Sequence, residues 1–482
     1  MNVDISPNSC IVVGAGPNGL AAAIEMASAN VPVVVYESAA TVGGGTRTEE
    51  LTLPGFRHDV CAAVHPLALA SPFFQTLPLE RHGLTWIHPR VALAHPFDDG
   101  TAALLQGSID ATAETLGRDA RAYGDLMAPV VVHWAHLADD ILGPLHWPRH
   151  GIPFVRFGLQ ALRPAQSLAT DRFRTDRARA FFVGLSAHSC LPPSRPPTTA
   201  FALVLAAAGH AAGWPIAAGG SHSISKALAA YLSTLDGRIV TSAEIRSVGD
   251  LPEARAVLLD VTPRQLLVLA GHQFNWLYRR QLGLYRYGPG VFKIDWALRG
   301  PVPWKAKECA LAGTVHLGGT MLEIAAAEQL VARGRHPQTP FVIFAQQSLF
   351  DPSRAPAGFH TGWAYCHVPN GARFDMTERI ERQVERFAPG FRDLIIARHT
   401  RTAAALELYD ANCVGGDISG GASTLGQLFT RPAIRLDPYS TSAPGIFICS
   451  ASTPPGGGVH GMCGYHAARS ALRARFAGRK EG

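Results

Sequence analysis

The stretch IVVGAGPNGLAAAIEMASANVPVVVYE, residues 11–37, places glycines at positions 14, 16 and 19 between two apolar runs. The first apolar run predicts a buried strand, the Ala-rich run predicts a helix, and the second apolar run predicts another strand. Gly14 permits a sharp turn out of the first strand, Gly16 lets backbone approach a pyrophosphate, and Gly19 lets the helix lie close to the sheet. We therefore predict a dinucleotide-binding unit in which the positive end of the helix meets the anion.

An acidic residue closes the second predicted strand. Glu37 follows Gly19 by about twenty residues, the spacing at which a carboxylate accepts hydrogen bonds from the adenosine ribose. Glu37 is therefore the predicted ribose ligand. Because a carboxylate repels a 2′-phosphate, the pattern disfavours NADP.

A second glycine cluster, GGGTR at residues 43–47, favours FAD over NAD. Gly44 and Gly45 allow the backbone to approach a long ligand, and Arg47 offers a cation to a phosphate or to the flavin ring. A nicotinamide enzyme would continue its helix at this place. The alternative interpretation is a flexible surface loop with a solvated arginine.

A loop rich in proline and glycine, Ser450–Gly461, lies between an apolar run and a helix predicted to begin near Met462. Such a loop brings backbone N–H groups and a helix N-terminus to one point. At the pyrimidine side of an isoalloxazine, that arrangement would favour the negative charge that develops on reduction. A second anion site or a plain turn is the alternative.

Four stretches together carry a family resemblance: VVGAGPNGLAAAIEMA, YESAATVGGGTRTEE, PGFRHDVCAAVHPLA and FICSASTPPGGGVHGMCGYHAA. They are similar to the bacterial phytoene desaturase-like FAD-dependent oxidoreductases, relatives of the amine oxidases and carotenoid desaturases. The resemblance implies an α/β fold with a discontinuous Rossmann-like FAD-binding domain and an inserted mixed α+β substrate domain. It also implies a strand at Ile245 whose backbone meets adenine. The cofactor-binding residues implied in this way are Gly14, Gly16, Pro17, Gly19, Glu37, Gly44, Gly45, Arg47, Ile245, Ala451, Gly457, Gly458 and Val459.

The hydrophobic pattern and the proline content change along the chain. These changes predict a nucleotide domain made of separated segments. α/β patterns alternate with Pro-rich helical stretches and with a strand-rich insertion. The FAD-binding domain is expected at residues 1–90, 215–271 and 396–482. The substrate-binding lobes are expected at residues 91–214 and 272–395.

Local patterns predict several elements within these segments. A helix is expected from Ser223 to Leu235 with Ser221 as its N-cap, followed by a strand pair around residues 238–248. An amphipathic helix is expected at Thr377–Phe387, beside strands that suit an antiparallel sheet lining a pocket. These strands are expected within residues 287–298, 340–348 and 360–369.

Composition excludes some classes of function. With 482 residues, 47% hydrophobic and 17% charged, the chain is long and apolar enough for a large core. The net charge is +6, but no Lys/Arg run stands out, so no nucleic-acid partner is predicted. The eight cysteines form no CxxC pair, and the N-terminus lacks a signal-peptide pattern, so we expect a cytoplasmic protein with reduced thiols. The apolar run Ala200–Trp214 is too short to span a membrane and predicts a buried helix, although peripheral membrane contact stays open.

Two other constellations point to different chemistry. His58, Cys61 and His65 resemble metal ligands, but no fourth ligand has suitable spacing, so no metal site is predicted. The segments GLSAHS and GGSHS contain serines that would be candidates for a catalytic nucleophile. Neither segment has a GxSxG motif between a strand and a helix, which such a nucleophile requires.

These observations predict an FAD-dependent oxidoreductase that acts on an apolar, polyene-like small molecule, free or carrier-bound. Hydride would pass from a C–H bond to flavin N5 and a neighbouring proton would be lost, which forms a double bond and requires a dry site. Candidates for the proton step are His460, Tyr465 and His466, which follow the glycine loop, and His65. The alternatives are a redox-neutral polyene double-bond isomerase, a flavin amine oxidase, and a non-enzymatic carrier of a lipid or pigment.

Overall fold

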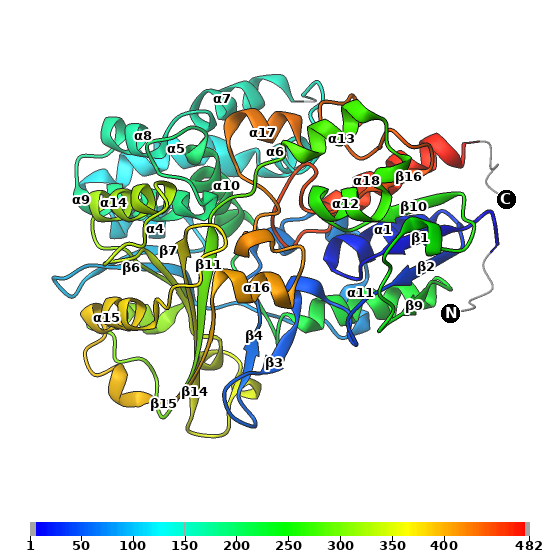
Figure 1. Cartoon of the computed structure of the whole chain (residues 1–482). Helices are drawn as coiled ribbons and strands as arrows, with labels where there is room; N and C mark the ends of the chain where they lie inside the picture. The colour runs from blue at the N-terminus through cyan, green and yellow to red at the C-terminus, as the bar shows by residue number, and fades with distance from the viewer. Residues whose placement is uncertain (1–5, 149, 478–482) are drawn as a thin grey trace.

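The computed structural model describes residues 6–148 and 150–477. Figure 1 shows two sheets on opposite sides of the molecule, with a group of helices above the second sheet. The first sheet is parallel and carries the glycine-rich turn. The second is mixed and forms one wall of a cavity.

The first sheet has five parallel strands. In spatial order they are β16 (Ile446–Ile448), β10 (Ala256–Leu259), β1 (Cys10–Val13), β2 (Val33–Tyr36) and β9 (Arg238–Val240). In β1, Cys10 and Val12 belong to one hydrophobic cluster, whereas Ile11 and Val13 belong to another. Both faces of the sheet are therefore covered, which explains why its strands are apolar runs without alternation.

Helices cover the two faces of this parallel sheet. The face of Cys10 packs against α1 (Pro17–Ser28), α11 (His222–Thr234) and α18 (Met462–Arg475). The opposite face packs against α12 (Pro263–Ala270) and α13 (Trp276–Gly283). Helices α1 and α18 touch at a glycine: a Cβ on Gly464 would lie 1.8 Å from the carbonyl oxygen of Asn18. Only a residue without a side chain permits this approach.

The second sheet has seven strands. In spatial order they are β15 (Ile395–Arg401), β11 (Gly290–Leu298), β14 (His360–Val368), β13 (Val342–Ala345), β12 (Ala312–Leu317), β6 (Val91–Pro96) and β7 (Ala102–Leu105). The antiparallel pairing predicted for β11, β13 and β14 is confirmed. Their further neighbours also pair antiparallel, whereas β12 and β6 are parallel. Strand β15 thus completes the sheet of the second insertion, and the predicted domain boundaries stay a prediction.

Alternation along the strands gives the second sheet two different faces. Phe292 and Ile294 of β11 pack in a cluster with α15 (Thr377–Phe387), the helix predicted at those residues. Lys293, between them, points to the other face and lines the cavity. One face of this sheet is therefore core and the other is cavity wall.

A group of helices lies above the mixed sheet (Figure 1). They are α4 (Ile109–Thr115), α5 (Ala120–Val132), α6 (Trp134–Ile141), α7 (Gly151–Ala161), α8 (Ala165–Arg172), α9 (Asp176–Ser186) and α10 (Thr198–Ala211). Of this group, α6, α7 and α10 contribute residues to the cavity lining. Helix α10 confirms the predicted buried helix, and it is apolar on all sides because other elements surround it. Among the residues described, no helix combines the length and apolar character needed to cross a membrane.

Short elements connect these layers. Two small antiparallel sheets pair β3 (Thr48–Glu50) with β4 (Arg57–Asp59) and β5 (Trp86–Ile87) with β8 (Ile216–Ala217). The remaining helices are α2 (Pro66–Leu69), α3 (Pro72–Gln75), α14 (Met321–Ala332), α16 (Ala403–Tyr409) and α17 (Leu425–Thr430).

Two local predictions are wrong. Strand β9 ends at Val240 and pairs with β2, so the expected strand pair is absent from residues 238–248 and Ile245 lies outside any strand. Ser221 precedes α11 but does not cap it, because its backbone is already helical and its hydroxyl donates to the carbonyl oxygen of Ala62 at 2.6 Å. All eight cysteines lie in the described part of the chain and are free thiols.

Candidate functional site

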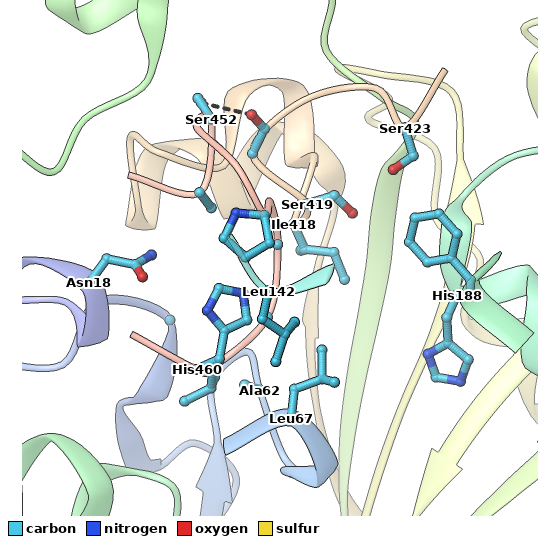
Figure 2. Close-up of a pocket in the computed structure, with 18 of the residues that line it drawn as sticks. Asn18, Ala62, Leu67, Leu142, His188, Ile418, Ser419, Ser423, Ser452 and His460 are labelled. Carbon is cyan, nitrogen blue, oxygen red and sulfur yellow. Dashed lines mark hydrogen bonds between the residues drawn. The ribbon is translucent and has the colours of Figure 1, made fainter. Parts of the chain in front are cut away.

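A cavity of about 830 Å³ lies between the parallel sheet, the mixed sheet and the helical lobe. Figure 2 shows Asn18 and His460 at the side of the nucleotide turn, and His188, Ser419 and Ser423 towards the mixed sheet. Residues that are distant in sequence thus line one continuous cavity. Its polar end lies at the glycine-rich segments, and its other end is lined mainly by apolar side chains.

The glycine-rich turn has the geometry that its sequence predicts. Gly14 has a φ of +104°, which favours glycine, and it connects β1 to α1. Gly16 and Pro17 line the cavity, and a Cβ on Gly44 would lie 3.3 Å from the Cα of Gly16. The two glycine clusters therefore meet. The predicted roles of Gly14, Gly16, Pro17, Gly19, Gly44 and Gly45 in cofactor binding stay predictions.

Glu37 and Arg47 contact each other. One Glu37 oxygen accepts a hydrogen bond from Ala15 N at 2.7 Å, and the other accepts from Ala39 N at 2.9 Å. Arg47 Nη2 lies 3.2 Å from the second oxygen. The carboxylate is thus held rigidly at the end of β2, where the predicted ribose contact would be made. Arg47 is a partner of this carboxylate, and its predicted contact with a phosphate or flavin stays a prediction.

Sequence reasoning missed an acidic residue at the centre of the turn. Asp260 follows β10, lines the cavity and accepts a hydrogen bond from Gly19 N at 2.9 Å. Burial raises the pKa of Asp260 to about 7, and the charges of Asp410 and Glu37 act in the same direction. This carboxyl group therefore titrates beside the place where a pyrophosphate would bind. It is separated from Gly19 by 241 residues, so no local pattern could reveal it.

The C-terminal glycine loop forms the opposite side of the polar end. Ala451, Gly457, Gly458 and Val459 line the cavity, as predicted for a cofactor-contacting loop. A Cβ on Gly457 would lie 2.9 Å from the Cα of Ser419, so this approach requires glycine. Their individual roles toward a flavin stay predictions.

Arg431 is a second residue that sequence reasoning missed. Its side chain lines the cavity, is 3% exposed, and lies 3.4 Å from the carbonyl oxygen of Ala451 through Nη1. Its Nε has no hydrogen-bond partner among the described residues. A buried guanidinium with a spare donor suits a ligand carbonyl or phosphate. Arg431 lies outside the sequence motifs, so none of them indicated it.

Of the four residues predicted for the proton step, His65 and His460 line the cavity. His65 Nε2 lies 2.8 Å from Ser221 Oγ, and His65 Nδ1 has no partner among the described residues. His460 Nδ1 accepts a hydrogen bond from Met462 N at 3.1 Å. Burial lowers the pKa of each histidine to about 4, so both are neutral at pH 7.

The other two candidates lie away from the cavity lining. Tyr465 stacks on Phe73 with ring centroids 4.9 Å apart. His466 Nε2 contacts the carbonyl oxygen of Leu142 at 3.2 Å, and burial lowers its pKa to about 4. Helix α18 turns both side chains towards packing contacts. Ile245 is likewise not part of the cavity lining and packs against the hydrophobic cluster on the outer face of the parallel sheet.

The apolar end of the cavity has walls from α7, α10 and the mixed sheet, together with Trp214, which follows α10. A buried cation interrupts this surface: Lys293 pairs with Asp295 and lies 5.8 Å from the ring centroid of Trp363. Apolar lining residues include Leu142, Phe154, Phe157, Phe201, Val204, Leu205, Ile343 and Tyr365.

These residues fit an FAD-like ligand. The polar end offers a glycine turn at a helix N-terminus, a fixed carboxylate at the end of β2, and a spare guanidinium donor beside the C-terminal loop. The close contacts of Gly44 and Gly457 leave backbone, not side chains, at the walls. Within the described part of the chain, no group of three metal-ligating side chains accompanies this site.

Comparisons with known proteins agree with this geometry. A model of the NAD(P)-binding Rossmann-like domain matches residues 12–76. The mouse protein named Pyridine nucleotide-disulfide oxidoreductase domain-containing protein 2 is 26% identical over 96% of this chain and 93% of its own length. One of the limonene dehydrogenase subunits of Castellaniella defragrans is 31% identical, over 28% of this chain and 24% of its own length.

Solved structures match over nearly the whole chain. An oxidoreductase from Methanosarcina mazei has a TM-score of 0.67 at 15% identity and covers 96% of this chain and 100% of its own. Putrescine oxidase bound to putrescine has a TM-score of 0.62 at 18% identity and covers 97% of this chain and 98% of its own. The chain therefore contains an NAD(P)-binding Rossmann-like domain, within the mixed α/β fold that it shares with structures of the amine oxidase type.

Proposed function

We propose that this chain is an FAD-dependent oxidoreductase that removes hydrogen from a C–H bond of an apolar, unsaturated substrate and forms a double bond. One observation carries the proposal: a single cavity joins the dinucleotide turn and the C-terminal glycine loop to an apolar compartment. When bound, FAD supplies a two-electron acceptor for the substrate hydride. The similarity to a protein named for limonene dehydrogenation supports an apolar substrate.

The residues of the chain have distinct tasks in this proposal. Gly16, Gly44 and the N-terminus of α1 bind the pyrophosphate, and Glu37 accepts hydrogen bonds from the ribose. Arg431 and the backbone of the C-terminal loop hold the pyrimidine side of the ring. The apolar walls exclude water, which protects a reactive substrate from hydration.

His65 is the group best placed to take a proton. The hydroxyl of Ser221 donates to the carbonyl oxygen of Ala62, so its oxygen accepts a hydrogen bond from a protonated His65 Nε2. His65 Nδ1 is then an unprotonated nitrogen without a partner among the described residues. His460 differs because its Nδ1 already accepts a hydrogen bond from Met462 N. We therefore assign proton acceptance to His65 Nδ1 and hydrogen-bond donation to His460 Nε2.

The mouth of the cavity supports entry of the substrate from an apolar phase. Leu145 and Leu436 line the cavity and are 70% and 107% exposed. Ile152 and Leu159 of α7 are also exposed nearby in sequence. Large apolar side chains exposed at the opening of a cavity are typical of an interaction site, and we propose peripheral contact with a lipid surface.

Anaerobic mixing tests the proposed function. Purified protein is first incubated with excess FAD and examined for bound flavin absorbance, then mixed with polyenes and amines delivered in micelles or lipid vesicles. Bleaching of the flavin by a polyene that gains a double bond is the expected result. A polyene isomerised without bleaching indicates the isomerase, and bleaching by amines alone indicates an amine oxidase. Absence of bound flavin overturns the proposal, and binding without any spectral or chemical change indicates a carrier.

We expect the affinity for FAD to decrease with pH because of Asp260. An anionic pyrophosphate beside this carboxyl favours its protonated form, so binding requires protonation once the pH exceeds about 7. The dissociation constant should rise by up to about tenfold per pH unit above 7. In Asp260→Asn this rise should disappear, because the amide is neutral and still offers an acceptor to Gly19 N.

Fluorescence of released FAD, followed from pH 6 to 9, measures this effect. Asp125→Asn, on the exposed surface of α5, is the matched control and should keep the wild-type slope. Equal slopes in wild type and Asp260→Asn would show that Asp260 does not couple protonation to binding.

A further inference from the structure

A cysteine, a histidine and a glutamate form a connected set behind one wall of the cavity. Cys190 Sγ lies 3.4 Å from His367 Nε2. His367 Nδ1 lies 2.9 Å from both carboxylate oxygens of Glu328. All three side chains are buried, with Cys190 the most exposed at 6%. They come from the turn after α9, from β14 and from α14, so the chain brings them together only on folding.

The hydrogen bonds give each group a defined task. Because Nδ1 faces a carboxylate, it is protonated and donates a hydrogen bond to Glu328, and Nε2 is free to accept the proton of the Cys190 thiol. Burial alone would lower the pKa of His367, but the charges of Cys190 and Glu328 outweigh it and raise the pKa well above its ordinary value. The imidazolium that forms is therefore stabilised. A nucleophile, a base and an orienting carboxylate in this order are the parts of an activated thiol.

The set lies directly behind residues that line the cavity. Cys190 Sγ lies 3.9 Å from Ser419 Oγ, and Ser419 lines the cavity. His188, two residues before Cys190, also lines it, and Figure 2 shows both wall residues. Cys190 has a φ of +55°, which is uncommon for a residue with a side chain.

We propose that Cys190, His367 and Glu328 form a nucleophilic thiol site that adds covalently to α,β-unsaturated carbonyl compounds in the cavity. His367 Nε2 takes the thiol proton, and the sulfur forms a C–S bond to the β-carbon. The electron pair of the C=C bond moves to the α-carbon, which receives the proton from His367 Nε2. The addition consumes no oxidant or reductant, and its reverse restores the thiol and the alkene.

Two other thiol chemistries fit these contacts less well. Acyl transfer needs backbone donors for an oxyanion beside the nucleophile, but Cys190 N donates to the carbonyl oxygen of Ala187 and Leu191 N contacts Ser189 Oγ. Peroxide reduction leaves a sulfenic acid that a second thiol normally resolves. The hydrogen-bond contacts of the Cys190 sulfur in the described chain are with His188, His367 and Ser419, none of which is a thiol. Conjugate addition needs neither an oxyanion site at the sulfur nor a second thiol.

Competitive labelling of the full chain tests the site. Methyl vinyl ketone is added to the purified protein, and peptide mass mapping follows the adduct on every cysteine. Cys190 should be labelled at least about tenfold faster than Cys366, which lies beside His367 in β14 and is 1% exposed. The labelling rate does not depend on flavin, so the outcome of this experiment is separate from that of the test of the proposed function. Equal labelling of the two cysteines would overturn the proposal.

Variants separate the three tasks. Cys190→Ser should abolish the fast adduct, and His367→Gln should slow labelling of Cys190 at least about tenfold because the base is lost. Glu328→Gln should slow it less, because the amide still orients the ring. His95→Gln is the matched control, since His95 is equally buried and its Nε2 contacts the carbonyl oxygen of Gly319.

Folding of each variant is checked by its thermal midpoint and by labelling of the unfolded chain. Wild-type labelling rates in folded His367→Gln would overturn activation by His367. A parallel arm with hydrogen peroxide checks the chemical class. Faster oxidation than ketone addition at Cys190 would overturn the assignment to unsaturated carbonyls and indicate a peroxide-reactive thiol.

Discussion

Arg354→Met should lower the free energy of unfolding by about 3–5 kcal/mol, the largest loss that we expect from a single substitution. Arg354 is fully buried and joins two buried carboxylates: Nη2 lies 2.9 Å from Asp59 and Nε lies 3.0 Å from Asp351. Methionine fills a similar volume but leaves both charges without their cation. Urea unfolding at pH 7, followed by tryptophan fluorescence, measures the loss.

The pH dependence of the free energy of unfolding provides a second test of the Arg354–Asp59 pair. Burial alone would raise the pKa of Asp59, but Arg354 and hydrogen bonds outweigh it and lower the pKa. An acid with a lowered pKa stabilises the fold above its unfolded pKa of about 3.9, and this contribution is lost as the pH falls through the folded pKa. The variant has lost this contribution, so its deficit relative to wild type should stay nearly constant from pH 7 to about 4 and should shrink only at lower pH, as the pH falls through the folded pKa of Asp59.

Arg382→Ala is the matched control for the charge. Arg382 forms an exposed pair with Glu378 on α15, and such pairs contribute about 0–1 kcal/mol. A loss in Arg354→Met no greater than in this control would show that the buried pair does not stabilise the fold.

Gly464→Ala should destabilise the protein by about 3 kcal/mol and weaken retention of the dinucleotide. The added methyl would lie 1.8 Å from the carbonyl oxygen of Asn18, and the obstacle is backbone, which cannot move away as a flexible side chain does. Separation of α18 from α1 would also displace Asn18, which lines the cavity. The thermal midpoint and the fraction of flavin released on ultrafiltration measure the two effects.

Gly124→Ala in α5 is the control for this substitution. A Cβ at Gly124 meets nothing within 4 Å, so alanine should stabilise the helix by about 0.5–1 kcal/mol. Opposite signs in the two variants are expected. A neutral Gly464→Ala would contradict the close helix contact.

Individual helices and strands were predictable where the spacing of apolar residues matches the repeat of one type of secondary structure. Helix α15 begins and ends at the predicted residues, and α18 begins at the predicted Met462. The strand pair around residues 238–248 was wrong, because this short segment has an apolar pattern but only its first part finds a neighbouring strand. Pairing depends on the sheet, not on the segment.

The candidate site was predictable in part. Gly16, Gly44 and the loop of Gly457 carry motifs with their own spacing, and these residues do line the cavity. Tyr465 and His466 were candidates because they follow this loop, but the turn of α18 directs them into packing contacts. Closeness in sequence does not set the direction of a side chain on a helix.

The sequence by itself determined the dinucleotide turn, its acid at Glu37, and the apolar runs that become the parallel sheet. Each follows from backbone geometry over a few neighbouring residues. Only the tertiary structure placed Asp260 against Gly19, across 241 residues, and Cys190 against His367, across 177 residues. Such contacts are fixed by the order of strands and the packing of helices on them, and no periodicity in a single segment encodes that order.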